Sequence, residues 1–317
     1  MKKIPILIDT DPAISIFGAD VDDALAIFLA LNSDELEVEG LTAVFGNTDV
    51  NNTYRIGKEI LSVANRTDIP LKKGAYNSSW LGVRTPAVKF LINHVMEHPG
   101  EITLVTLAPL TNIATAILLE PKFSENLKSI LMMGGLFFPS NQRFPVLQSE
   151  FNFSRDPEAT QIVLAQDIEN TIIGLDLTTQ VLFKDVNFSA LAQRNTRITK
   201  YLTKHIKSWL FLNKLLMGGF NPHDPLCVAY LLKKSLYKTI KASVEVRILK
   251  QRKKSEFIHK KYSNSLLSLI PSLLTKNGSL KVTIPPADSR KNKVTVCTSI
   301  DKENFLKLLL ERLSKSS

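Results

Sequence analysis

The sequence predicts an α/β fold in which helices flank an open, mostly parallel central sheet. Through the first 180 residues, short runs of β-branched and other apolar residues alternate with segments whose apolar residues recur at helical spacing. This alternation is typical of parallel strands joined by helical crossovers. The chain has 317 residues and is 44% hydrophobic, enough to bury a large core. Because no linker rich in Pro, Gly or Ser divides it, we expect one domain over residues 1–317.

Each expected element rests on its own pattern. The strands of the first part are short apolar runs bounded by polar or turn residues, at 4–8, 37–44, 102–106, 130–132 and 171–174. The helices between them carry apolar residues on one face, at 22–31, 51–64, 110–119 and 156–165. After about residue 180 helices are expected at 198–216, 225–232 and 302–313, and strands at 242–249, 279–284 and 293–297.

The charge of the chain is uneven. Lys and Arg (40) exceed Asp and Glu (30), and the formal net charge of +10 first suggests a polyanionic partner. Residues 4–54, however, contain ten acidic residues and no Lys or Arg, while residues 233–261 contain eleven Lys and Arg against two acids. No nucleic-acid-binding motif accompanies the basic segment. We therefore expect no nucleic-acid partner, and an acidic region that calls for a cation.

Cysteine use and hydropathy bear on the cellular compartment. The two cysteines, Cys227 and Cys297, are far apart in the sequence, which argues against a disulfide framework. No run approaches the roughly 18–20 apolar residues that a membrane helix needs. The sequence thus predicts a cytoplasmic protein with no membrane partner.

Five acids gather around the end of the first expected strand. Asp9 and Asp11 follow its apolar run, and Asp20, Asp22 and Asp23 open the next helix. One interpretation is helix capping by Asp20 or Asp22, with Asp23 favoured by the helix dipole. The other is a site for a hard cation, Ca²⁺ above all, because clustered carboxylates raise one another's pKa unless a cation offsets them. Capping leaves Asp9 and Asp11 unexplained at the sheet edge where ligands bind, so the cation site is favoured.

Five motifs follow one another in a fixed order. They are Asp9-Thr10-Asp11-Pro12 with Asp22-Asp23-Ala24, then Gly46-Asn47, then Leu107-Ala108-Pro109-Leu110-Thr111-Asn112-Ile113-Ala114, then Met133-Gly134-Gly135 with Glu150-Phe151-Asn152 and Asp156-Pro157-Glu158-Ala159, and last His223-Asp224-Pro225. In this order they resemble the inosine-uridine preferring nucleoside hydrolases, or nucleoside N-ribohydrolases. The resemblance implies the nucleoside hydrolase fold with its Rossmann-like core. It also implies Ca²⁺-dependent cleavage of ribonucleosides into nucleobase and ribose, and a homodimer or homotetramer.

The resemblance also implies roles for individual residues. Asp11 and Asp23 would bind Ca²⁺ through their carboxylates, and Asp224 and the backbone carbonyl of Leu107 would complete the protein ligands. Asp11 would also deprotonate a Ca²⁺-bound water, and His223 would lie near the leaving base as its proton donor. The ribose would be held by Asp22, Asn47, Glu150 and Asn152, with Met133 and Asn141 as neighbours.

Structural roles are the alternative for several of these residues. Asn47 and Asn152 could be turn residues, His223 could begin a helix that Asp224 caps, and Met133 could belong to the core. Glu150 stands in an apolar stretch, where a buried carboxylate needs a partner. At the level of function, the alternative is a family member that binds a nucleoside or ribose without turnover.

The first motif departs from the family signature D-T-D-P-G-x-D-D-A. Ala13 replaces the usual Gly, and seven extra residues separate Pro12 from Asp22. Because Ala tolerates a tight backbone turn less well than Gly, we expect Gly18 to supply the turn and a longer loop to deliver the Asp pair. A His found near residues 76–83 in many members is also missing here, which leaves the base preference open.

Overall fold

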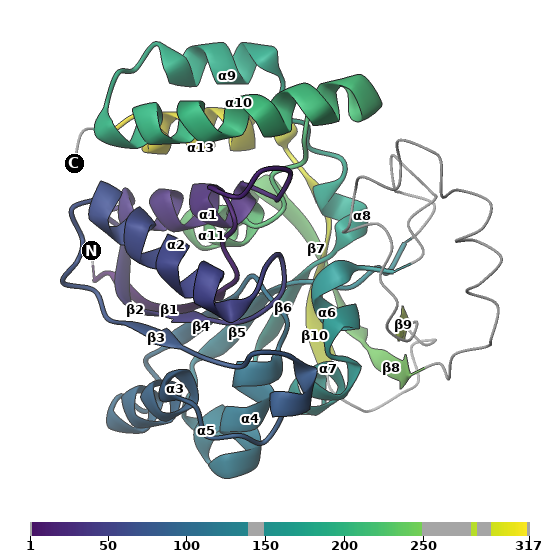
Figure 1. The fold of residues 1–317 in the computed structure, drawn as a ribbon. Helices are drawn as coiled ribbons and strands as arrows, with labels where there is room; N and C mark the ends of the chain where they lie inside the picture. Colours follow the sequence, from purple (N-terminus) through teal and green to yellow (C-terminus); the bar gives the residue numbers. More distant parts are fainter. Residues whose placement is uncertain (1, 139–148, 249–279, 284–292, 316–317) are drawn as a thin grey trace, which may run out of the picture.

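The computed structural model describes residues 2–138, 149–248, 280–283 and 293–315. Its centre is a sheet of eight strands in the order β3-β2-β1-β4-β5-β6-β10-β7 (Figure 1). Neighbouring strands are parallel, except that β7 runs antiparallel to β10. Because β3 and β7 are free edges, the sheet is open, and the predicted fold class is confirmed. The strands are β1 Ile4–Thr10, β2 Leu36–Ala43, β3 Leu71–Lys73, β4 Thr103–Thr106, β5 Ser129–Met133, β6 Asn170–Ile173, β7 Tyr237–Ser243 and β10 Lys293–Ile300.

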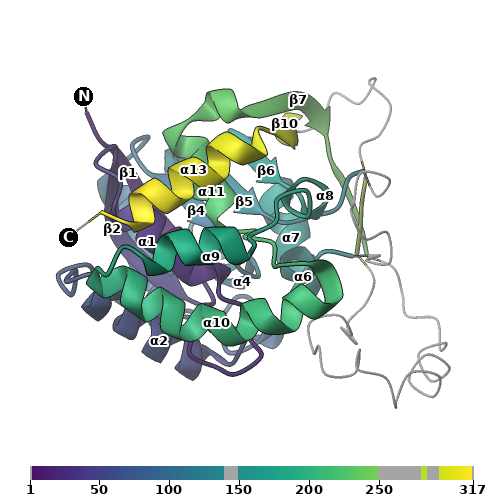
Figure 2. The same cartoon turned by 90° about the horizontal axis from the view of Figure 1, so that it is seen from above.

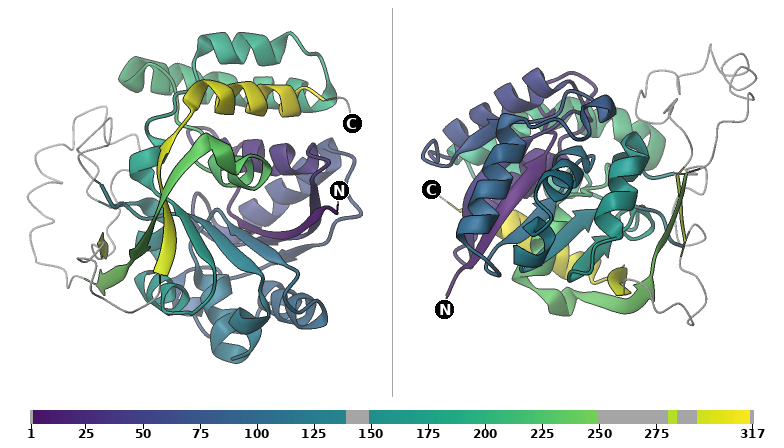
Figure 3. Two further views of the ribbon diagram at one scale, coloured as in Figure 1. Left: turned by 180° about the vertical axis from the view of Figure 1, so that it is seen from behind. Right: turned by 90° about the horizontal axis from the view of Figure 1, so that it is seen from below.

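Helices cover both faces of this sheet. On one face lie α1 (Asp22–Leu31), α2 (Val50–Val63) and α11 (Pro225–Leu232), and an outer layer of α9 (Asp185–Ala192), α10 (Arg197–Met217) and α13 (Lys302–Leu313) covers them (Figures 1 and 2). On the other face lie α3 (Pro86–Glu97), α4 (Thr111–Leu119), α5 (Phe123–Asn126) and α7 (Pro157–Leu164) (Figure 3). Each face has its own buried apolar cluster, as a parallel sheet requires.

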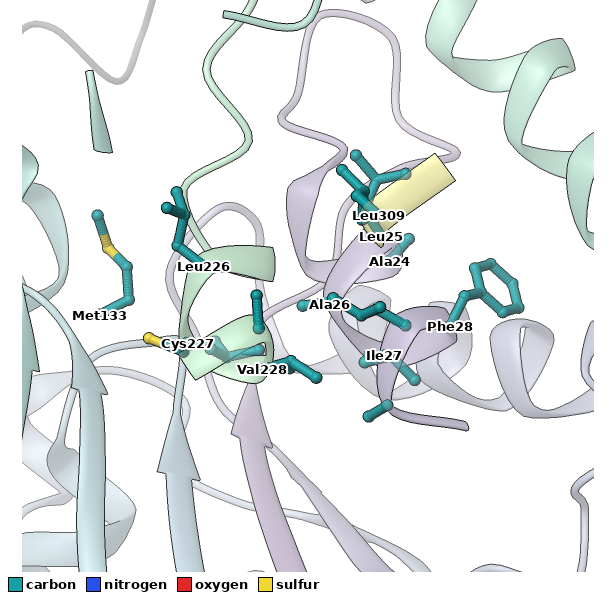
Figure 4. Close-up of a cluster of buried hydrophobic side chains, with 14 of the residues drawn as sticks. Ala24, Leu25, Ala26, Ile27, Phe28, Met133, Leu226, Cys227, Val228 and Leu309 are labelled. Atoms are coloured by element: carbon teal, nitrogen blue, oxygen red, sulfur yellow. The ribbon is translucent and has the colours of Figure 1, made fainter. Parts of the chain in front are cut away.

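The packing of α1 against α11 positions the polar residues at the sheet edge. From Ala24 to Ala30 every residue of α1 is apolar and buried, so this helix is hydrophobic all round. Figure 4 shows Leu226, Cys227 and Val228 of α11 in the same buried cluster as the side chains of α1. Because α1 follows a parallel strand, its first turn lies at the carboxyl edge of the sheet, and the packing brings the start of α11 beside it.

The structure also corrects the predicted elements. The strand expected at 242–249 is divided between two strands: β7 ends at Ser243 and pairs with β10, whereas β8 (Glu245–Ile248) pairs with β9 (Leu280–Thr283). The edge strand β7 does not form a continuous apolar run, because Lys238 and Lys241 are exposed. The apolar pattern therefore did not predict its full length. Parts of the predicted strands at 242–249 and 279–284 lie outside the described residues.

Some elements were not predicted at all. The helix α3 begins at Pro86, behind an N-cap residue, Thr85, whose hydroxyl accepts a hydrogen bond from the Val88 amide at 3.2 Å. The strand β3 is only three residues long and carries little periodicity. The short helices α6 (Phe151–Arg155) and α8 (Leu175–Thr178) were missed for the same reason. Among the described residues, none of the helices is both long enough and apolar enough to span a membrane.

Candidate active site

Three carboxylates meet at the carboxyl edge of the sheet. Asp22 and Asp23 form the first turn of α1, and Asp224 directly precedes α11. One carboxylate oxygen from each of them lies within 4.8 Å of the other two, and all three residues are buried. The Asp224 amide also donates a hydrogen bond to Asp22 Oδ2 at 3.2 Å. The group thus contains two of the expected metal ligands, Asp23 and Asp224, together with Asp22, which we expected to bind ribose.

The capping interpretation of the acids is wrong for α1. The N-cap position is Val21, and no side chain caps the helix. Asp20 lies outside the helix, where its Oδ1 accepts a hydrogen bond from the Val21 amide at 2.7 Å. Asp22 and Asp23 remain in the first turn, where the helix dipole favours negative charge.

The insertion after Pro12 returns the chain to the site. Ala13 and Ile14 are buried, and successive backbone hydrogen bonds, from Ile16 to the Ala13 carbonyl and from Ala19 to the Ile16 carbonyl, turn the loop. Gly18 adopts φ +76°, a conformation that side-chain-bearing residues rarely take. The loop thus supplies the turn at Gly18, as expected, and the Asp pair reaches the end of β1.

Asp11 is held beside this group. Its amide donates to Asp23 Oδ1 at 3.1 Å, and its Oδ2 accepts the Asn47 amide at 2.6 Å. The Asn47 side chain in turn donates to Asp23 Oδ2 at 3.0 Å, so one asparagine contacts two acids. The other oxygen, Asp11 Oδ1, is buried and has no hydrogen-bond partner. An orphaned carboxylate oxygen in such a place is expected to bind a ligand that is not part of the chain.

The carboxylates of the site destabilise one another. Burial raises the pKa of Asp11 well above its usual range, and the charge of Asp23 raises it further. Burial, with the charge of Asp22, raises the pKa of Asp23 to about 7. Burial and the same neighbour raise the pKa of Asp224. A divalent cation that prefers oxygen ligands would offset this repulsion, and the orphaned Asp11 oxygen beside three clustered acids fits such an ion.

The opposite wall of the site comes from the loop after β4 and from α6. Asn152 donates through Nδ2 to the carbonyls of Leu107 at 2.9 Å and Met133 at 3.2 Å. A carbonyl oxygen has two lone pairs, so Leu107 retains one for a cation. Glu150 caps α6 and accepts hydrogen bonds from the amides of Asn152, Phe153 and Gly135. Met133 is buried in the core cluster, and Asn141 lies outside the described residues.

His223 completes the expected set. It is half-buried, and its Nδ1 lies 2.7 Å from the hydroxyl of Thr178, the last residue of α8. Burial lowers the pKa of His223, and the nearby charge of Asp22 works in the opposite direction. Asp224 occupies the N-cap position of α11, as the structural alternative expected, although its side chain makes no capping hydrogen bond.

The sequence patterns did not predict that a positively charged side chain, Arg155, lies beside these acids. Arg155 donates from Nη2 to the Gly46 carbonyl at 3.2 Å, and its guanidinium lies 4.9 Å from the centre of the Phe151 ring. Burial lowers the pKa of Arg155, and the charge of Asp11 raises it. Its position three residues after Asn152 on one short helix was the available signal, because such residues share a helix face.

The fold and this site define an α/β protein with an acidic centre at the carboxyl edge of a parallel sheet, where three buried carboxylates could hold a metal ion. The chain belongs to the inosine-uridine preferring nucleoside hydrolase family, whose model matches residues 6–307. This membership confirms the family predicted from the motifs and the predicted enzyme class, an N-glycosidase of the nucleoside hydrolase type.

Individual relatives agree with this assignment. The chain is 33% identical to a probable uridine nucleosidase 2 of Arabidopsis thaliana, over 73% of this chain and 78% of that protein. It is 29% identical to the inosine-uridine preferring nucleoside hydrolase of Crithidia fasciculata, over 77% of this chain and 83% of that protein. A solved plant nucleoside hydrolase, PpNRh1, shares 26% identity and superposes with a TM-score of 0.79 over 99% of both chains.

Gly46 offers a direct test of how Asp11 is placed. A Cβ at this position would lie 1.8 Å from Asp11 Oδ2 and 3.0 Å from Pro109 Cδ. We therefore expect Gly46→Ala to displace the Asp11 carboxylate, to lower kcat/KM for a nucleoside at least about 10-fold and to cost about 1–3 kcal/mol of unfolding free energy. Steady-state kinetics and urea unfolding measure the two effects.

The control for this substitution is Gly100→Ala. Gly100 has φ +76° and no atom within 4 Å of an added Cβ, so an alanine there would introduce backbone strain away from the acids. This variant should lose stability and keep kcat/KM. If Gly46→Ala keeps full activity as well, close packing against Gly46 does not place Asp11.

Proposed function

We propose that the protein is a Ca²⁺-dependent nucleoside hydrolase, which cleaves the N-glycosidic bond of ribonucleosides to give free nucleobase and ribose. The observation that carries the proposal is the orphaned oxygen of buried Asp11 beside the three clustered acids. The names of the relatives, uridine nucleosidase and inosine-uridine preferring nucleoside hydrolase, support nucleosides as the substrate class.

Four groups would hold the ion: the carboxylates of Asp11, Asp23 and Asp224 and the backbone carbonyl of Leu107. The carboxylate of Asp22 is close enough to those of Asp23 and Asp224 to contact the same ion. All five residues are buried, and carboxylate and carbonyl oxygens are the ligands that Ca²⁺ prefers. When bound, the ion supplies Lewis acidity, which lowers the pKa of water and orients it.

The protein groups divide the remaining work. Cleavage passes through an oxocarbenium-like sugar, which carboxylates stabilise through charge and through hydrogen bonds to the ribose hydroxyls. Asp11 accepts the proton of the attacking water. His223 donates a proton to the leaving base. The ribose contacts are assigned to Asp22, Asn47, Glu150 and Asn152, with Met133 and Asn141 as neighbours.

A reducing-sugar assay tests the proposal. Inosine, uridine, adenosine and cytidine are each incubated with the protein, in Ca²⁺ and in EGTA, and released ribose is measured. We expect ribose from at least one nucleoside and loss of this activity in EGTA. If no nucleoside yields ribose from protein shown to bind Ca²⁺, the non-catalytic nucleoside- or ribose-binding alternative replaces the hydrolase.

Two further properties belong to this proposal. Buried, unpaired cysteines at 227 and 297 support a reducing compartment, in keeping with the cytoplasm. The family resemblance supports a homodimer or homotetramer, which light scattering on the purified protein measures directly.

A further inference from the structure

The Thr178 hydroxyl contacts His223, the histidine to which the proposed function gives the role of proton donor. We propose that Thr178 is a positioning residue, which holds the imidazole of His223 so that Nε2 is directed at the departing nucleobase. This inference rests on the proposed hydrolase function. Thr178 is fully buried, and neither its position in the sequence nor any motif marks it.

The hydrogen bonds around Thr178 leave His223 one free nitrogen. Thr178 Oγ1 lies 2.7 Å from His223 Nδ1 and 3.3 Å from the Leu175 carbonyl, to which it donates. No described residue hydrogen-bonds to Nε2. When one ring nitrogen of a histidine is engaged in this way, its partner fixes the ring orientation and the role of the other nitrogen.

The backbone brings Thr178 and His223 together independently of this contact. The segment after α8 pairs with the segment before His223: the Phe183 amide donates to the Phe220 carbonyl at 2.7 Å, and the Phe220 amide donates back at 3.1 Å. The side-chain amide of Asn221 donates to the carbonyls of Thr179 and Val181.

The chain is anchored on the other side of His223 as well, where the Asp224 amide donates to Asp22 Oδ2. The backbone is therefore held by hydrogen bonds on both sides of His223, at Phe220 and at Asp224. Loss of the Thr178 hydroxyl would free the imidazole ring and leave the backbone in place.

The proposed role concerns one proton in the reaction. As the bond between C1′ and the base nitrogen breaks, its electron pair goes to that nitrogen, which takes a proton from Nε2 of the His223 imidazolium. The neutral imidazole that remains keeps its Nδ1 proton, which Thr178 Oγ1 accepts, because that hydroxyl donates its own proton to the Leu175 carbonyl. The water oxygen bonds to C1′, and a proton of that water goes to Asp11. A leaving group that departs as a stable anion does not need the proton from His223. A variant that impairs only leaving-group protonation should therefore lose activity on the nucleoside and keep it on a substrate with such a leaving group.

The experiment compares two substrates, the best nucleoside and 4-nitrophenyl β-D-ribofuranoside. For Thr178→Val, which keeps the side-chain shape, we expect kcat on the nucleoside to fall about 10-fold with KM within about 2-fold. On the nitrophenyl riboside we expect kcat to be unchanged. Thr178→Ser should restore nucleoside turnover, and His223→Gln should show the same substrate pattern with a loss of about 100-fold.

Thr179→Val is the matched control, because Thr179 is buried beside Thr178 and its hydroxyl donates to the Leu175 carbonyl at 2.8 Å without contacting His223. It should leave both substrates unaffected. An equal loss on both substrates for Thr178→Val, or no loss on either, overturns the inference while the hydrolase proposal stands. If the wild-type protein hydrolyses neither substrate, the proposed function fails and this inference falls with it.

Discussion

The substitution Asp11→Ala is expected to abolish nucleoside hydrolysis, with a loss in kcat of about 10²–10⁴-fold. The variant loses the proposed base and one of the proposed cation ligands together. It also leaves the Asn47 amide, which donates to Asp11 Oδ2 at 2.6 Å, without its acceptor. Ribose release under saturating nucleoside and Ca²⁺ measures the loss, and circular dichroism verifies that the variant is folded.

Asp20→Ala is the matched control, since the same side chain is truncated at a neighbouring acid. Asp20 is half-buried, and it is not among the three acids whose oxygens lie within 4.8 Å of one another. Burial, the charge of Asp22 and a side-chain hydrogen bond with Asp22 raise the pKa of Asp20, so Asp20 contacts the cluster although it is not one of its three acids. We expect less than about a 10-fold loss of kcat. Equal losses in the two variants would mean that the acids are paired wrongly across the insertion.

The substitution Asp224→Asn is expected to have opposite effects on ion binding and on the stability of the ion-free protein. Removing one of the buried carboxylates should weaken Ca²⁺ affinity about 100-fold, because the ion loses a charged ligand. The same change relieves repulsion from Asp22 and Asp23, so the melting temperature in EGTA should rise. Calorimetric Ca²⁺ titration and thermal unfolding, with and without Ca²⁺, measure these two effects.

In the wild-type protein, saturating Ca²⁺ should raise the melting temperature, because a ligand at 100 times its Kd adds about 2.7 kcal/mol to the free energy of unfolding. Asp224→Asn should lose this increase. The control is Asp49→Asn, at the exposed N-cap of α2, where Asn caps about as well as Asp. It should bind Ca²⁺ as the wild-type protein does. If Asp224→Asn also binds Ca²⁺ normally, the ion is held elsewhere.

Much of the fold could be predicted because its pattern is local. The apolar runs of β1 and β4 to β6 and the amphipathic α2 show their structure within a few residues, and parallel strands must place their carboxyl ends at one edge. Edge strand β7 and the three-residue β3 could not be predicted in this way, since their stability comes from pairing with neighbours and not from their own composition.

The candidate site divides in the same manner. Asp11 and Asp23 were recognisable as a charged group at the end of a buried strand, and the motif order added Asn47, Glu150, Asn152, His223 and Asp224. Arg155 and Thr178 were not recognisable. Each contacts a residue far away in the chain: Arg155 contacts the Gly46 carbonyl, and Thr178 contacts the His223 ring. Single positions of this kind leave no periodicity and no spacing that a sequence pattern could show.

The sequence by itself determined the α/β class, the order of most elements, the acidic edge after β1 and, through its motifs, the nucleoside hydrolase family. The tertiary structure alone decided which polar atoms meet. Asp224 stands 202 residues from Asp22, yet its amide lies 3.2 Å from that carboxylate because the apolar helices α1 and α11 pack together. Periodicity records which face of an element is buried, whereas the distances within a site depend on how the buried faces fit against one another.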